Sequence, residues 1–404
     1  MTRKLIITAL LLITIVPCLR AQKKEISQAR EYIKSGENLD QAASLMEGLI
    51  NKDTLNRKNP KIYLTWFDAV EKQYEAGNQK LYLKQAFDTT LLYQYTKTMF
   101  DIVCQLDSIV MGDDKIKADR KKRGKYAETL DRYRRNLYVG GVHHLRHDDF
   151  KQAFIYFDTY IASASKPLFA QYDYNANDRR MTDAAFWATC CANRMGDPHL
   201  AFRYGKRAEE VADTTKKLLV MRWEAEAALQ SGDTLQYVGH LRRGFRMDPR
   251  YKFNFPRLMD YYTDHHRPDS ALRLADDALR VAPNDPLFLY AKSTLLLNMG
   301  RNDECIQVTS RLIALCDTMA LPYFNIGTAV LNKIVTLEED PMADKEEIRQ
   351  YYKEALPYMR RFRQMEPREQ DKWAPALYRI YFNLNMGSEF EEIDRLINAG
   401  NKKP

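Results

Sequence analysis

The feature that most constrains the fold is an internal repeat of 34 residues between Leu218 and Met319. Gly232, His266 and Gly300 occupy the same phase of three successive units. Two later phases hold mostly small residues. They are Tyr237, Ala271 and Cys305, followed by Gly244, Ala278 and Leu312. Self-similarity at a fixed period is typical of proteins built from stacked supersecondary units.

The middle unit predicts two short amphipathic helices. Apolar residues recur at helical spacing over residues 255–262 and 271–278, on either side of a turn. Pro268 suits the start of the second helix, and Pro283 ends it. Neither helix can bury its apolar face alone, so each unit needs neighbours stacked against it. The sequence therefore predicts an all-α protein.

The period, the small residues and the closing prolines resemble the tetratricopeptide repeat (TPR) family. This resemblance implies an α-solenoid of stacked helix-turn-helix units and covers most of the chain after residue 21. In the last unit, the run Asn385-Met386-Gly387 matches Asn298-Met299-Gly300, which predicts a turn at Gly387. The same register predicts a helix that begins near Pro60 and a turn at Gly77.

Extending this register over the chain predicts four segments. They are a signal peptide at 1–21, an N-terminal helical region with degenerate TPR-like hairpins at 22–133, a TPR-like solenoid at 134–330 with an insertion at 168–181, and C-terminal TPR-like hairpins at 331–404 with an insertion at about 332–350.

The N-terminus indicates export. Arg3 and Lys4 precede an apolar run from Leu5 to Val16, and a plausible cleavage site follows Ala21, as in a secretory signal peptide. We expect a periplasmic or extracellular protein. A lipoprotein processed at Cys18 is the less favoured alternative, because the residues before it lack the small side chain that such processing favours. No later segment reaches the ~18 consecutive apolar residues of a membrane span.

Charge and cysteine content exclude two further classes. The chain has a formal charge of +8, reduced by removal of the leader, and its basic run Lys115 to Lys125 is more typical of a solvated face than of a nucleic-acid site. We expect no nucleic-acid partner. One of the six cysteines lies in the leader, and the odd number that remains argues against a disulfide scaffold.

Candidates for chemistry are weak. His143 and His147 are one turn apart and could share a metal, but a structural role is favoured, with His144 directed inward and His147 at a turn. The insertion resembles the start of a calcium loop, yet Asp178 and Ala184 stand where glycine and glutamate are required.

We therefore expect the insertion to be a surface loop that packs Phe169, Tyr172 and Tyr174 on the solenoid. Catalytic motifs, a phosphate loop and a dinucleotide fingerprint are absent from the sequence. The sequence predicts no catalytic residue, no cofactor, no metal and no enzyme.

The TPR resemblance implies a concave groove, lined by the first helices of the repeats, that binds a protein or peptide segment. The groove positions carried over to this chain are Arg135, Tyr138, Trp187, Asn193, Arg194, Arg222, Trp223, Glu226, Arg257, Asp260, Tyr290, Asn298 and Asn325. Arginine and tryptophan often dominate binding energy at interfaces. The leading hypothesis is thus a non-enzymatic, exported interaction scaffold, although the two tryptophans could instead pack between adjacent first helices.

Two other functions stay open. Binding of a glycan or the cell wall is suggested by a row of aromatic residues in the same groove, namely Tyr138, Trp187, Trp223, Tyr290 and Phe324. A hydrolase or metal site at the 168–181 insertion is the third and weakest hypothesis.

Overall fold

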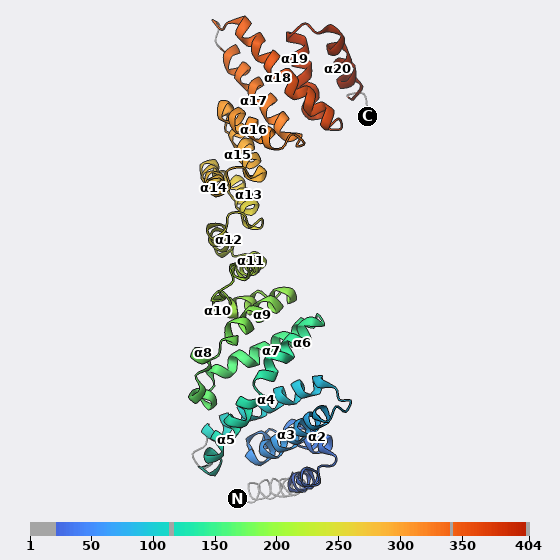
Figure 1. Ribbon diagram of the computed structural model, residues 1–404, viewed down its shortest axis with the longest axis vertical. Coiled ribbons are helices and arrows are strands. Elements are labelled where there is room, and N and C mark those ends of the chain that lie inside the picture. The colour runs from blue at the N-terminus through green and yellow to red at the C-terminus, as the bar shows by residue number, and fades with distance from the viewer. Residues whose placement is uncertain (1–21, 113–116, 340–341, 401–404) are drawn as a thin grey trace, which may run out of the picture. The chain divides into compact units, whose positions relative to one another are not determined.

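The computed structural model describes residues 22–112, 117–339 and 342–400, so the predicted leader lies outside it. Every regular element in these ranges is an α-helix or a 3-10 helix, and within each part of the chain most successive helices pack against each other as hairpins (Figure 1). The predicted fold class, an all-α stack of helix-turn-helix units, is confirmed. None of the helices in the described ranges is long and apolar enough to cross a membrane.

The chain divides into two compact units, with the boundary between Tyr237 and Val238. A helix over residues 22–35 opens the described part of the N-terminal unit. It is followed by α2 (Leu39–Lys52), α3 (Pro60–Tyr82), α4 (Thr89–Gly112), α5 (Lys117–Tyr133), α6 (Arg135–Arg146), α7 (Phe150–Ala162), α8 (Tyr174–Asn177), α9 (Arg180–Met195), α10 (Pro198–Ala208) and α11 (Thr214–Gln230), with 3-10 turns η1 (Asn56–Lys58), η2 (Ser163–Ser165) and η3 (Pro167–Tyr172).

Most of α12 (Thr234–Met247) belongs to the C-terminal unit. The helices that follow it are α13 (Asn254–Asp264), α14 (Pro268–Val281), α15 (Pro286–Asn298), α16 (Asn302–Leu315), α17 (Leu321–Glu338), α18 (Lys345–Met365), α19 (Gln370–Asn383) and α20 (Gly387–Gly400). Of the insertion predicted at about 332–350, residues 332–338 extend α17 and residues 345–350 begin α18.

The repeat phase found in the sequence marks the end of each first helix. Gly232, His266 and Gly300 all adopt the left-handed conformation, with φ of 76°, 52° and 70°. After α15, the N–H of Arg301 donates to the carbonyl of Leu296 at 2.9 Å, which is the hydrogen bond of a Schellman cap. A cap of this kind reverses the chain, so the repeated residue sets where each hairpin turns.

Small residues fill the helix crossings, as the repeat predicts. Ala271, Ala278 and Cys305 have no exposed surface, while Tyr237, which departs from the small-residue pattern, is only half-buried. A small side chain lets two helix backbones approach closely. The cysteine at position 305 is therefore explained by packing.

Two predicted turns are wrong. α3 continues through Gly77, where an added Cβ would lie 2.5 Å from the ring of Phe87, and the left-handed turn residue is Lys84. In the last unit the left-handed residue is Asn385, while Gly387 starts α20. Glycine occurs at close helix contacts as well as in turns, and asparagine also tolerates the left-handed conformation. The presence of glycine alone therefore predicted both turns at the wrong residues.

The 168–181 insertion packs onto the N-terminal unit, as predicted. Leu168, Phe169 and Tyr174 are buried. The ring of Phe169 stacks on Phe100 of α4 with centroids 5.6 Å apart, and Tyr172 stacks on Tyr174 at 5.5 Å. These aromatic contacts give the insertion its own hydrophobic anchor.

Candidate functional site

In the N-terminal unit, the first-helix residues of α9 and α11 form an aromatic cluster. The ring of Phe186 is buried between Trp187 and Trp223, with centroid distances of 5.0 and 5.1 Å. Both tryptophans keep part of their surface exposed. Each therefore packs against its neighbours and leaves part of its surface accessible to solvent.

Tyr138 of α6 joins this cluster from the preceding hairpin. Burial raises the pKa of its hydroxyl, as does the charge of Asp183, and a hydrogen bond with Trp187 opposes the shift. The ring of Tyr138 also packs on Phe157 and Tyr160 of α7, at 5.7 and 5.8 Å. Most of this side chain is thus committed to the core.

A polar network lies beside the aromatic cluster. The side-chain amide of Asn193 on α9 donates to Glu226 on α11 at 3.1 Å, and Nε of Arg222 donates to the other oxygen of Glu226 at 2.8 Å. The structure thus brings three predicted groove residues together. Arg194 and Arg135 are exposed on the same first helices, α9 and α6.

The groove residues of the C-terminal unit are less connected. The Arg257 guanidinium donates to the carbonyl of Phe253 at 3.0 Å and lies 3.9 Å from the centre of its ring, so it is anchored at the start of its own helix. Asp260 and Asn298 are exposed, and Tyr290 is half-buried. Among the residues that the structure describes, no hydrogen bond or ion pair links these four to one another.

Asn325 is a packing residue. Its side chain is 4% exposed, and its amide donates to the hydroxyl groups of Ser293 at 2.9 Å and Thr294 at 3.2 Å. It therefore holds α17 against α15 and is not available to a ligand, contrary to its assignment to the groove.

The histidine cluster of α6 has the structural role predicted for it. The ring of His144 stacks on Tyr156 at 5.2 Å, while Nδ1 of His147 lies 2.8 Å from the carbonyl oxygen of His143 at the end of the helix. Burial and then the neighbouring imidazole of His147 lower the pKa of His143. His144 thus packs against α7, and His147 caps the end of α6.

The residue that organises the insertion, Arg134, was missed by sequence reasoning. It is 5% exposed, and its guanidinium binds the hydroxyl of Ser163, the carbonyl of Tyr160 and the carboxylate of Asp178. Its charge lies between the rings of Tyr160 and Tyr174, 3.7 and 3.8 Å from their centres. Five contacts from one side chain join α6, α7 and the insertion.

This network also includes Asp178, which stands where a calcium loop requires glycine. Asp178 accepts hydrogen bonds from Arg134 and from the hydroxyl of Tyr160. Burial alone would raise the pKa of Asp178, but these hydrogen bonds outweigh it and lower the pKa. The carboxylate is therefore committed to holding the insertion in place.

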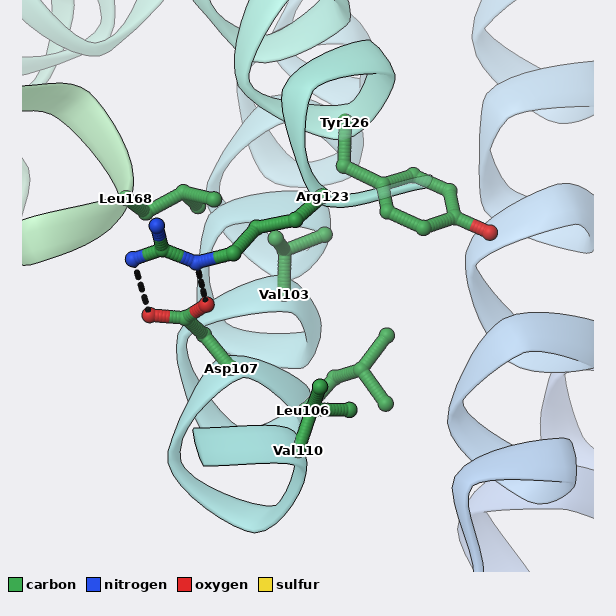
Figure 2. A pocket seen from close by; sticks show the side chains of 7 residues that line it. All are labelled: Val103, Leu106, Asp107, Val110, Arg123, Tyr126 and Leu168. Atoms are coloured by element: carbon green, nitrogen blue, oxygen red, sulfur yellow. Dashed lines mark hydrogen bonds and ion pairs between the residues drawn. The ribbon is translucent and has the colours of Figure 1, made fainter. Parts of the chain in front are cut away.

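A small cavity lies between α4, α5 and η3 (Figure 2). Val103, Leu106 and Leu168 line it, and Arg123 forms a two-pronged ion pair with Asp107 at its side. Its volume of about 10 Å³ holds one water molecule at most. This cavity is a gap in packing and too small for a ligand.

Among known proteins, the similarity of this chain is to solved structures at low identity. No protein-family model matches the chain, and no curated protein matches it. Among solved structures, it is similar to the C-terminal part of a TPR repeat-containing protein from Cytophaga hutchinsonii, at 11% identity over 65% of this chain and 94% of that chain, with a TM-score of 0.42. The fold assignment rests on the helices of this chain itself.

Two further structures are similar over different lengths. YrrB, described as a TPR protein with an unusual peptide-binding site, matches at 14% identity over 49% of this chain and 92% of its own, with a TM-score of 0.34. The TPR domain of P58(IPK) matches at 12% identity over 95% of this chain and 100% of its own, with a TM-score of 0.25.

Proposed function

We propose that this protein is a non-enzymatic interaction scaffold that binds a protein segment on the first-helix surface of its N-terminal unit. The observation that supports it is the pair of partly exposed tryptophans on α9 and α11, the helices that also carry the exposed residues Arg194 and Arg222. Tryptophan and arginine are the residues most enriched where binding energy concentrates.

The surface is also held in shape before a partner arrives. Trp187 and Trp223 rest on buried Phe186, and Glu226 fixes Arg222 through a 2.8 Å hydrogen bond. Side chains that are already ordered lose little conformational entropy on binding. Such a surface suits an extended segment with an apolar residue for the tryptophans and an acidic residue for the arginines.

A peptide selection tests the proposal. A library of random peptides is panned against the purified protein, and the affinity of enriched peptides is measured by fluorescence anisotropy. Truncating Trp223 or Arg194 to alanine should weaken binding about tenfold or more. Arg203→Ala, on the second helix α10, removes an exposed arginine away from this surface and should have little effect.

An unchanged affinity in both Trp223→Ala and Arg194→Ala would reject the proposed surface. Glycan or cell-wall binding remains the alternative, and a glycan array probed with the same protein examines it. Binding on the array that depends on Trp223, without peptide enrichment, would favour the glycan.

We also propose export, which the leader supports through Arg3, Lys4 and the apolar run from Leu5 to Val16. These residues lie outside the described part of the chain. Mass spectrometry of the protein from its native cells should give a chain that begins at Gln22. An intact leader would reject export by this route, and a lipid on Cys18 would favour the lipoprotein alternative.

A further inference from the structure

An open groove rich in arginine lies on the second helices of the C-terminal unit. Its volume is about 500 Å³, and α12, α13 and α14 form its walls. The lining residues are Arg242, Phe245, Arg246, Tyr262, Ser270, Arg273, Leu274 and Asp277. Three guanidinium groups thus face one carboxylate, and that carboxylate, Asp277, pairs with Arg280 at 2.9 Å.

The arginines are oriented but not neutralised. Nε of Arg242 donates to the hydroxyl of Tyr262 at 3.0 Å, and the Arg273 guanidinium donates to the hydroxyl of Ser270 at 3.3 Å. Within the described ranges, no carboxylate forms an ion pair with Arg242, Arg246 or Arg273. Their charges are therefore available to a ligand.

In the last hairpins of the same unit, an equivalent arginine is paired with a carboxylate. Arg360 of α18 donates to the hydroxyl of Tyr381 at 3.2 Å, in the same way as Arg242 donates to Tyr262. It also donates to the carboxylate of Glu389 on α20 at 3.0 Å. One turn further along α20, Glu392 pairs with Arg363.

The left-handed turn residues put the two sites in register. Ser270 follows His266 by four positions, as Glu389 follows Asn385, and Arg273 follows His266 by seven, as Glu392 follows Asn385. The two glutamates that neutralise the arginines of α18 are thus replaced in α14 by a serine and an arginine. At position 242 the α12–α14 groove has the counterpart of Arg360, but Ser270 stands where Glu389 would supply the carboxylate.

We propose that the α12–α14 groove binds acidic side chains of a partner protein, and that one of their carboxylates lies beside Arg242 as Glu389 lies beside Arg360 in the last hairpins. A guanidinium group pairs with a carboxylate through two parallel hydrogen bonds. Phe245 and Leu274, both buried, form an apolar floor for the aliphatic part of such a ligand. The occupant is therefore an acidic peptide segment with apolar residues between its carboxylates.

This inference does not depend on the first-helix surface, because none of the residues proposed to bind there lines the groove. The two proposals can therefore fail separately. Variants at Arg194 and Trp223 should leave binding in the groove unchanged.

The test uses the full chain and a short fluorescent peptide rich in glutamate and leucine, with a twin that carries glutamine in place of every glutamate. We expect the glutamate peptide alone to bind, with an affinity that falls as salt is added. Ser270→Glu supplies an internal carboxylate where Glu389 stands in the last hairpin, and should weaken binding about tenfold or more. Ser270→Gln, which adds bulk without charge, should weaken it far less.

Arginine variants provide the second arm. Arg242→Ala and Arg273→Ala should each weaken the glutamate peptide about tenfold. Arg311→Ala removes the same charge from an exposed position on α16, outside the groove lining, and should change the affinity less than about twofold. Circular dichroism melting shows that each variant is folded before its affinity is compared.

Three outcomes would overturn the proposal. They are equal binding of the glutamine twin, an unchanged affinity in Ser270→Glu, and displacement of the peptide by inorganic phosphate or a sulfated oligosaccharide at a lower concentration than by unlabelled peptide. The last outcome would identify a phosphate or sulfated glycan as the ligand.

Discussion

The region around Arg134 and the regular repeats from α13 to α16 join their helices by different means. Around Arg134, one buried guanidinium connects α6, α7 and the insertion through hydrogen bonds and two aromatic rings. In the repeats, small buried residues such as Ala271 and Cys305 let helices approach, and left-handed residues cap them.

The difference shows what replaces the repeat pattern where it degenerates. Small residues at helix crossings act through close contact and depend on a constant spacing. An inserted segment breaks that spacing, and a long polar side chain can then reach partners that the repeat does not place. Four predictions test this comparison.

The largest effect should come from Arg134→Ala. The variant leaves the partly buried Asp178 carboxylate without its cation and should lower the free energy of unfolding by about 3 to 5 kcal/mol. Urea unfolding followed by circular dichroism measures the change. The matched control is Arg135→Ala, which removes an exposed arginine and should stay within about 0.5 kcal/mol. A loss below about 1 kcal/mol for Arg134→Ala would mean that the aromatic packing holds the insertion alone.

In the regular repeats, Ala271→Leu should cost about 1 to 3 kcal/mol, because the larger side chain has no space at a fully buried crossing. The same urea titration measures it. An unchanged melting temperature would contradict the assignment of Ala271 to a close helix crossing.

At the left-handed turn position, glycine should give a more stable protein than a residue with a side chain. Gly300→Ala places a Cβ at a φ of 70° and should cost about 1 kcal/mol. His266→Gly removes the same conflict from the preceding unit and should cost nothing. Equal losses in both variants would show that the side chain of His266, and not its backbone conformation, matters at that turn.

The smallest change in stability should appear at acidic pH, because protonation removes the charge of Asp178 but keeps its side chain in place. Burial opposes ionisation of this carboxyl, but hydrogen bonds from Arg134 and Tyr160 prevail and lower its pKa. The folded protein therefore binds this proton less readily than the unfolded chain does. The stabilisation is complete above the unfolded pKa of about 3.9 and is lost as the pH falls towards the folded pKa. Urea unfolding over an acidic pH series should show a flatter profile for Asp178→Asn, and parallel profiles would contradict this assignment.

Much of the fold could be predicted from the periodicity of the sequence. The phase at Gly232, His266 and Gly300 located three helix ends, because the left-handed cap recurs wherever the hairpin must reverse. The same register predicted the burial of Ala271 and Cys305. It failed at Gly77 and Gly387, where glycine has other uses.

The candidate site could be predicted only in part. The first-helix assignment grouped Asn193, Arg222 and Glu226 correctly, because residues one repeat apart occupy the same place on neighbouring first helices. It could not show that Asn325 is buried. The burial of Asn325 depends on Ser293 and Thr294 of α15, whose hydroxyl groups accept hydrogen bonds from its amide on α17.

The sequence by itself determined the helical class, the repeat register and the three turns at Gly232, His266 and Gly300, since these follow from local periodicity and backbone preference. The tertiary structure alone decided which charges are neutralised. Arg134 forms an ion pair with Asp178, 44 residues away, and Arg360 forms one with Glu389, 29 residues away. Arg242 and Arg273, in contrast, line an open groove. Pairing between distant side chains depends on how helices pack, and no local pattern records it.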